Sequence, residues 1–300
     1  MIDHRLRTLQ LVAHHGSVTA AAQVLHFTPS AVSQQLRGLS EELGVDLVTQ
    51  VGRRMEPTAA GRILLRHADA LHARAESARA ELAAVGDAAG RIGLCGFSTA
   101  MTLLAPTAAA LRARFPDLEI QVREAEPARC IDLLLSGDGD LALLVVDDRV
   151  PPITDTRFDQ RPLFDDRIDL AVPAGHRLTT RSRLSLRDAA RESWIVSPPE
   201  SPYYRLLLSA CQAAGFRPAV AHYSAEWDTG AALVAHGLGV YLLPRLAPLH
   251  RDDVVRIPLT GPSAPVRHIA ALTRAGAAGQ PTIAHALGTI DGVVAEILAG

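Results

Sequence analysis

Apolar positions in the N-terminal part of the chain recur every three or four residues, the period of amphipathic helices. This period predicts helices over residues 3–14, 18–26 and 28–44. In the third helix, Thr28 suits the N-cap position and Gly44 the residue after the last turn. Its predicted buried stripe consists of Val32, Leu36, Leu39 and Leu43.

The segment after the third helix alternates in the manner of short strands. Residues 45–58 read VDLVTQVGRRMEPT, and Gly52 lies at the expected tip of a hairpin. Two short helices, a tight turn, a third helix and a hairpin are the order of elements in a winged helix-turn-helix. We therefore expect a winged helix-turn-helix domain over residues 1–58.

A long helix is predicted from Ala59 to about Val85, within the linker of residues 59–88 that leads to the next domain. Its apolar positions alternate in steps of four and three, which is the pattern of a coiled-coil seam between two chains. Packing of the same helix on a neighbouring domain is the alternative. The GDAAG segment at 86–90 predicts a hinge. The expected seam residues are Leu64, Ala68, Leu71, Ala75, Ala78 and Leu82, followed by Val85.

Beyond the linker, strand and helix patterns alternate through residues 89–300. Two such βαβ runs predict α/β lobes with parallel strands and a ligand cleft between the lobes. Lobe I is expected at about 89–163 and 266–300, and lobe II at about 164–265. The predicted fold class is α/β, with an N-terminal helical domain.

Composition narrows the chemistry. The 300 residues carry a net charge of −2, and all 30 basic residues are Arg, so a Walker A lysine and a lysine Schiff base to pyridoxal phosphate are excluded. No apolar run is long enough for a membrane helix, and the N-terminus does not resemble an export leader. We therefore expect a cytoplasmic protein. The three Cys residues have no metal-ligand spacing, and His14–His15 has no partner at such a spacing. We therefore expect no metal, no cofactor and no catalytic residues.

Several segments together resemble the LysR-type transcriptional regulators over nearly the whole chain. The resemblance implies a regulator that binds double-stranded operator DNA and dimerises through the linker helix, usually forming a tetramer. It also implies a two-lobed domain, similar to periplasmic binding proteins, that holds a small-molecule effector. The wing departs from the family at Val48, Thr49 and Gln50, where Phe, Glu and Arg are frequent. The matching segments are GSVTAAAQVLHFTPSAVSQQLRGLSEELGVDLV, GRRMEPTAAG, GDLALL, PLFDDRIDLAVPAGHRL, AAGFRP and LVAHGLGVYLLPRLA.

The resemblance gives a use to the polar face of the third helix. An ordinary solvated face would carry Glu and Lys, whereas hydroxyl, amide and guanidinium groups read base edges in a major groove. We expect direct readout by Ser30, Ser33, Gln34 and Arg37, and phosphate contacts by Ser17, Thr28 and Arg53. Helix capping alone is the alternative for Ser17 and Thr28.

Hydroxyls at strand ends predict the effector site. Ser98 and Thr99 follow a strand and open a helix, where an anion such as a carboxylate is held well. Ser197 and Ser201 stand at the matching place in lobe II. Nearby acids, which are Glu126, Glu226 and Asp228, would receive an amine, so an amino-acid-like effector is expected. The alternative is that the hydroxyls only cap helices and the acids are only solvated.

A solute-binding protein without a DNA-binding role is the rival function. It would share the two lobes, but the expected winged domain and the absence of a leader count against it. An enzyme with a regulatory lobe is a second rival, weakened by the missing lysine and metal patterns. The sequence therefore predicts an effector-controlled DNA-binding regulator.

Overall fold

The computed structural model describes residues 2–85, 90–181 and 183–299. The chain divides into two compact units, Met1–Leu163 with Ala270–Gly300, and Phe164–Ile269. The expected hinge and the domain boundary next to it fall on residues 86–89, outside the described residues. No described helix is both long and apolar enough to cross a bilayer.

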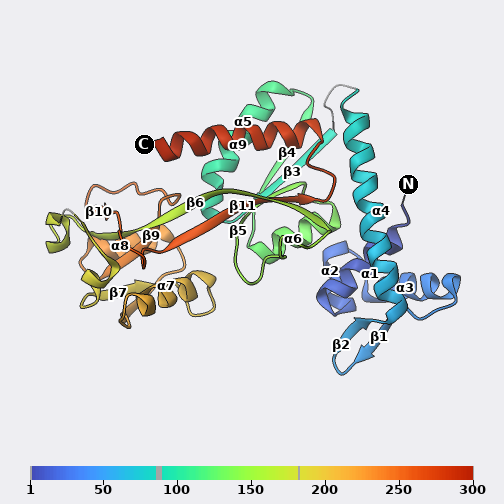
Figure 1. The fold of residues 1–300 in the computed structure, drawn as a ribbon, viewed down its shortest axis with the longest axis horizontal. Coiled ribbons are helices and arrows are strands. Elements are labelled where there is room, and N and C mark those ends of the chain that lie inside the picture. Colours follow the sequence, from blue (N-terminus) through green and yellow to red (C-terminus); the bar gives the residue numbers. More distant parts are fainter. Residues whose placement is uncertain (1, 86–89, 182, 300) are drawn as a thin grey trace. The chain divides into compact units, whose positions relative to one another are not determined.

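Three helices and a hairpin open the first unit, in the order predicted from the sequence (Figure 1). The apolar stripes of the helices meet in one core, which includes Leu9, Val32 and Leu36. Leu43 differs from the prediction: its side chain is 46% exposed, because the stripe passes beyond the core at the last turn. The elements are α1 (His4–His15), α2 (Val18–Leu25), α3 (Pro29–Leu43), β1 (Val48–Val51) and β2 (Arg54–Pro57).

The linker helix α4 (Ala59–Ala83) follows the hairpin directly. Thr58 caps it by accepting a hydrogen bond from the N–H of Gly61 at 3.0 Å. A Cβ on Gly61 would lie 2.0 Å from the carbonyl oxygen of Leu47. Only glycine therefore allows the first turn of α4 to approach the hairpin this closely.

The rest of the first unit is an α/β lobe. Its strand β3 pairs in parallel with β4 on one side and β5 on the other, as predicted. The helix α5 packs against β3, β4 and α9, whereas α6 packs against β3 and β5 and also contacts α1 and α2. The elements are β3 (Gly90–Gly96), a 3-10 turn (Ser98–Ala100), α5 (Met101–Arg114), β4 (Leu118–Glu124), α6 (Pro127–Ser136), β5 (Leu141–Val145) and α9 (Pro281–Ala299).

The second unit is another α/β lobe with its own core around Trp194 and Leu242. Its strand β7 pairs in parallel with β8 and β9. The elements are 3-10 turns at Arg177–Thr180 and Leu186–Ala189, β7 (Ser193–Val196), α7 (Pro202–Ala213), β8 (Ala219–Tyr223), α8 (Trp227–Ala235), β9 (Val240–Pro244) and β10 (Val254–Ile257).

Two strands run from one unit into the other, β6 (Phe158–Pro173) and β11 (Val266–Arg274). The sequence indicated only residues 167–173 of β6, because the first half of the strand is largely polar and lacks an apolar run. In the second unit β6 pairs antiparallel with β9 and with β10, a short strand that the sequence did not indicate.

Candidate functional site

The buried side of α3 is fixed by its caps and its stripe. The N–H of Ala31 donates to Thr28 Oγ1 at 3.2 Å, and Gly44 ends the helix in the left-handed conformation. Val32, Leu36 and Leu39 are all buried. The rotation of α3 is therefore set, and so is the direction of its opposite face.

That opposite face is exposed and lacks acids over the first turns of the helix. Ser30, Ser33, Gln34 and Arg37 are all exposed. Among the described residues, no carboxylate pairs with Arg37. Hydroxyl, amide and guanidinium groups thus stand together on one side of a helix, with their hydrogen-bonding capacity directed outward.

The turn before α2 is held by the hairpin. Ser17 caps α2, since its hydroxyl accepts from the N–H of Ala20 at 3.3 Å. Gly16 adopts a positive φ of 63°, its carbonyl accepts from the N–H of Met55 at 2.9 Å, and the guanidinium of Arg54 lies against it. Both Ser17 and Thr28 act as helix caps here, so any phosphate contact would come in addition to that role.

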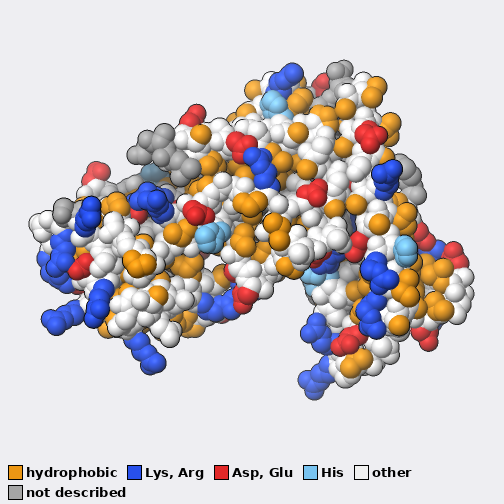
Figure 2. Space-filling model, viewed as in Figure 1, with side chains coloured by type: hydrophobic (Ala, Val, Ile, Leu, Met, Phe, Trp, Pro, Cys, Tyr) orange, Lys and Arg blue, Asp and Glu red, His pale blue; other side chains and the backbone are white. Residues whose placement is uncertain are grey.

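Basic side chains continue from the hairpin along the start of α4. Arg53 is exposed at the hairpin tip, and Arg62 and Arg66 are exposed one turn apart on α4. Figure 2 shows basic side chains over this end of α4 and near the hairpin. Sequence reasoning missed the two α4 arginines, although their i, i+4 spacing directly after the wing was a usable signal. At the wing, the Gln50 amide donates to the carbonyl of Gly52 at 3.2 Å.

The predicted seam of α4 divides between two environments. Ala68 and Ala75 are buried within the chain itself, whereas Leu71 is 51% and Leu82 is 68% exposed. Leu64 and Ala78 are half-buried, and Val85 is exposed. The seam prediction must be corrected at Ala68 and Ala75, because the chain's own N-terminal and lobe residues already cover that side of the helix.

A charged network lies on the covered side of α4. Glu76 is 3% exposed and accepts hydrogen bonds from Arg274 Nε at 3.2 Å, Arg79 Nη1 at 2.7 Å and Gln280 Nε2 at 3.0 Å. Arg274 also donates to Asp140 at 2.7 Å. Burial opposes the charge of Arg274, but Glu76 and Asp140 more than offset it and raise the pKa of the guanidinium.

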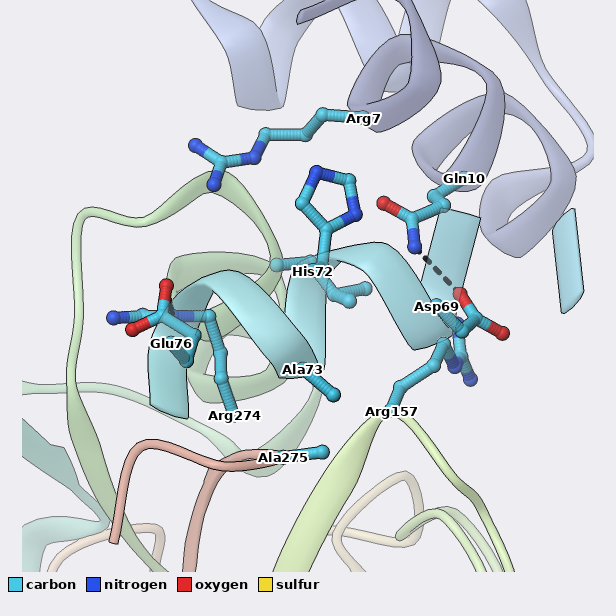
Figure 3. Close-up of a pocket in the computed structure, with 10 residues that line it drawn as sticks. Arg7, Gln10, Asp69, His72, Ala73, Glu76, Arg157, Arg274 and Ala275 are labelled. Atoms are coloured by element: carbon cyan, nitrogen blue, oxygen red, sulfur yellow. Dashed lines mark hydrogen bonds and ion pairs between the residues drawn. The ribbon is translucent and has the colours of Figure 1, made fainter. Parts of the chain in front are cut away.

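A cavity of about 30 Å³ lies beside this network (Figure 3). Arg7 and Gln10 of α1 reach it from one side and His72 of α4 from another. Gln10 Nε2 donates to Asp69 Oδ1 at 2.5 Å. Burial raises the pKa of Asp69, and burial followed by the charge of Arg7 lowers the pKa of His72. At that volume the cavity suits one or two waters rather than an effector.

The effector residues expected in lobe I do not all have the predicted setting. Ser98 is exposed and Thr99 is 3% exposed, in a 3-10 turn. The helix α5 begins only at Met101, so neither hydroxyl caps it as the sequence suggested. Glu126 is exposed at the N-cap position of α6, and its side chain makes no capping hydrogen bond.

The residues expected in lobe II have clearer roles. Ser197 directly follows β7 and is buried. Ser201 caps α7, accepting from the N–H of Tyr203 at 3.2 Å, so its oxygen already has a partner. Asp228 and Glu226 are exposed at the start of α8. The geometry therefore leaves Ser197 as the buried hydroxyl, with Glu226 and Asp228 as exposed acids at the start of α8.

Sequence reasoning missed an aromatic cluster beside these residues. The ring of Trp227 meets that of Tyr203 edge to face at 4.8 Å and lies 5.9 Å from that of Tyr241. Burial raises the pKa of the Tyr241 hydroxyl, and the neighbouring Ser197 hydroxyl opposes the shift. Arg267 lies over Trp227 and donates from Nε to buried Asp166 at 3.0 Å. No local sequence pattern indicated this cluster, because its three aromatic residues lie far apart in the chain and meet only in the fold.

Comparison with protein families matches both parts of the chain. Residues 4–62 match the family of bacterial regulatory helix-turn-helix proteins of the lysR type. Residues 86–293 match the LysR substrate binding domain. The two matches together cover both the α3 surface and the lobes.

Individual relatives extend over most of the chain. The transcriptional regulator AlsR of Bacillus subtilis is 31% identical over 237 residues, covering 76% of this chain and 75% of AlsR. A probable hydrogen peroxide-inducible genes activator of Streptomyces viridosporus is 33% identical over 288 residues, covering 91% and 88%. The solved structure of HinK, a LysR family regulator from Pseudomonas aeruginosa, is 26% identical, with a TM-score of 0.59 and 99% coverage of both chains.

Proposed function

The chain belongs to the LysR family of DNA-binding transcriptional regulators, and on that premise we propose that α3 reads its operator directly. The observation that carries the proposal is the exposed, acid-free face of Ser30, Ser33, Gln34 and Arg37, opposite the buried part of the stripe. A major groove admits one helix, in which Gln pairs with adenine and Arg with guanine.

Phosphate contacts would position this helix on the duplex. Ser17 and Thr28 stand at helix N-termini, where backbone N–H groups and the helix dipole attract anions. Arg53 at the hairpin tip and Arg62 and Arg66 on α4 add positive charge. These contacts carry affinity for any sequence, whereas the α3 face carries specificity.

We propose that two chains pair through the exposed apolar side of α4. Large apolar side chains are exposed to solvent at Leu71, Leu82 and Ile63. A partner helix packed on this side would remove them from water. A dimer with twofold symmetry predicts an operator with two half-sites in dyad relation. The proposal also includes assembly of two such dimers into a tetramer. The regulator would act in the cytoplasm, where its operator DNA is.

The effector is proposed to be an amino-acid-like molecule that contacts strand ends in both lobes. Lobe I contributes Ser98, Thr99 and Glu126, and lobe II contributes Ser197, Ser201 and Asp228. The support lies in each lobe separately. Thr99 is buried in the 3-10 turn that follows β3, and Ser197 is buried directly after β7. In each lobe an exposed acid stands at a nearby helix start. The aromatic cluster around Trp227 would enclose the apolar part of such a ligand.

Footprinting the protein on the DNA upstream of its own coding region tests the proposed function. We expect protection of a site with two related half-sites, and binding that weakens steeply as salt rises. A solute-binding protein built on the same lobes would protect nothing at any salt concentration. That result would overturn operator recognition.

Substitution of Thr99 tests the effector site. In thermal melting with a panel of amino acids and related metabolites, the wild type should be stabilised by at least one compound. Thr99→Val should lose that shift while operator binding without effector persists. Thr107→Val is the matched control, because the buried Thr107 hydroxyl donates within α5 to the Leu103 carbonyl at 2.8 Å. A Thr99→Val protein that responds like wild type would place the effector elsewhere.

A further inference from the structure

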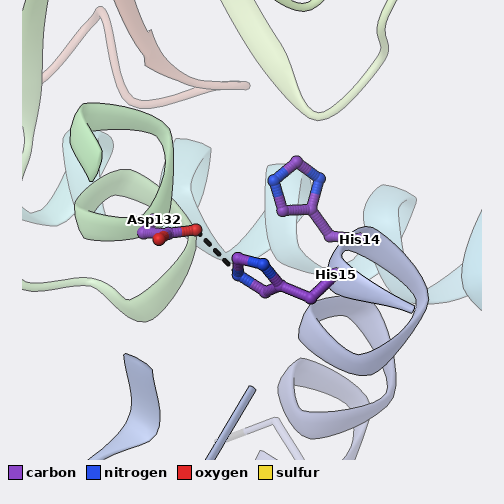
Figure 4. A group of neighbouring side chains, drawn as sticks. All are labelled: His14, His15 and Asp132. Carbon is purple, nitrogen blue, oxygen red and sulfur yellow. Dashed lines mark ion pairs between the residues drawn. The ribbon is translucent and has the colours of Figure 1, made fainter. Parts of the chain in front are cut away.

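Three side chains with metal-binding atoms meet where the N-terminal domain contacts lobe I. His14 and His15 end α1, and Asp132 lies on α6 (Figure 4). One ligand atom from each lies within 4.8 Å of the other two. The sequence offered no partner at metal-ligand spacing for the two histidines, because Asp132 belongs to a different domain.

The geometry of the closest pair is informative. His15 Nε2 lies 2.9 Å from Asp132 Oδ1, with the two side chains 22% and 13% exposed. Both atoms are buried, yet neither has an aligned hydrogen bond among the described residues. Two ligands bonded to one ion at about 2.0–2.2 Å stand roughly 2.9–3.5 Å apart, for bond angles between octahedral and tetrahedral. The pair therefore has the spacing of neighbouring ligands on one ion.

We propose that His14, His15 and Asp132 bind one divalent transition-metal ion, of the class of Zn²⁺ or Co²⁺. Two imidazoles and one carboxylate suit this class, whereas Mg²⁺ and Ca²⁺ prefer oxygen ligands throughout. Such an ion would join α1 of the DNA-binding domain to α6 of the effector-binding domain. The proposal is independent of the operator and effector assignments.

Charges of both signs surround the three side chains. Asp132 itself is one of the proposed ligands, and the nearby Arg157 is paired with Asp155 at 2.7 Å.

Titration of the full-length, metal-stripped protein with Zn²⁺ in a calorimeter, and with Co²⁺ in an absorption spectrometer, tests the site. We expect one ion per chain, a ligand-field spectrum for Co²⁺, and a rise in melting temperature with Zn²⁺. Loss of an outer-shell partner of a metal site costs roughly 10–100-fold in metal affinity. Asp132→Asn and His14→Gln each remove a direct ligand, so each should weaken Zn²⁺ binding by at least that factor.

The exposed pair of His268 and Asp165 supplies the matched control. Its Nδ1–Oδ1 distance is 2.7 Å, and no third ligand completes a cluster there in the described part of the chain. Asp165→Asn should therefore bind Zn²⁺ like wild type. The site would be overturned if the wild type did not bind Zn²⁺, or if Asp132→Asn and His14→Gln both bound it with wild-type affinity. His15 and Asp132 would then be only a close side-chain pair.

Discussion

The helices α3 and α4 carry apolar stripes of similar clarity, but the structure uses them differently. The stripe of α3 is buried as far as Leu39 against α1 and α2, which are close in sequence, and the opposite face is exposed. The stripe of α4 is divided, with Ala68 and Ala75 covered by the chain itself and Leu71 and Leu82 exposed. Periodicity therefore shows which side of a helix is apolar but not what covers it.

The polar residues of the two helices differ in the same way. Gln34 and Arg37 on α3 are exposed, and no carboxylate among the described residues pairs with Arg37. Glu76 on α4 is instead buried and bound by Arg274 and Gln280, far along the chain. A polar residue on a helix can thus serve an external partner or an internal network. The surrounding fold decides which.

Placing aspartate at two positions of the α4 stripe separates its two environments. Ala68→Asp puts an unpaired carboxylate into the core, and we expect a loss of several kcal/mol in the free energy of unfolding, measured by urea denaturation. Leu71→Asp should leave that stability nearly unchanged but abolish dimers in sedimentation at micromolar concentration. A dimeric Leu71→Asp protein would show that chains pair elsewhere.

Removal of Glu76 tests the internal network of α4. Glu76→Ala leaves Arg274 buried with one acid fewer, and we expect a cost of about 3–5 kcal/mol in urea unfolding, the range for breaking a buried ion pair. The exposed pair of Arg161 and Asp291 is the control. Arg161→Ala should cost no more than about 1 kcal/mol. Equal effects of the two substitutions would contradict a structural role for Glu76.

The predictable part of the molecule is the part set by neighbours in sequence. Caps such as Thr28, the stripe of α3 as far as Leu39 and the parallel strands of each lobe followed from local pattern and turn chemistry. Residues that meet only through long-range contacts could not be predicted from local pattern. Asp132 meets His15, and Arg274 meets Glu76, only because strands and helices far apart in the chain pack together. The start of β6 was missed because its polar residues show no apolar run.

Operator affinity of Gln34→Ala tests most directly the claim that α3 reads bases. We expect a loss of about 1–3 kcal/mol on operator DNA with nearly unchanged binding to random duplex, because a base contact and no phosphate contact is removed. Arg53→Ala should instead weaken both and flatten the salt dependence. If Gln34→Ala bound operator and random DNA with wild-type affinities, the assignment of this face to base readout would be contradicted.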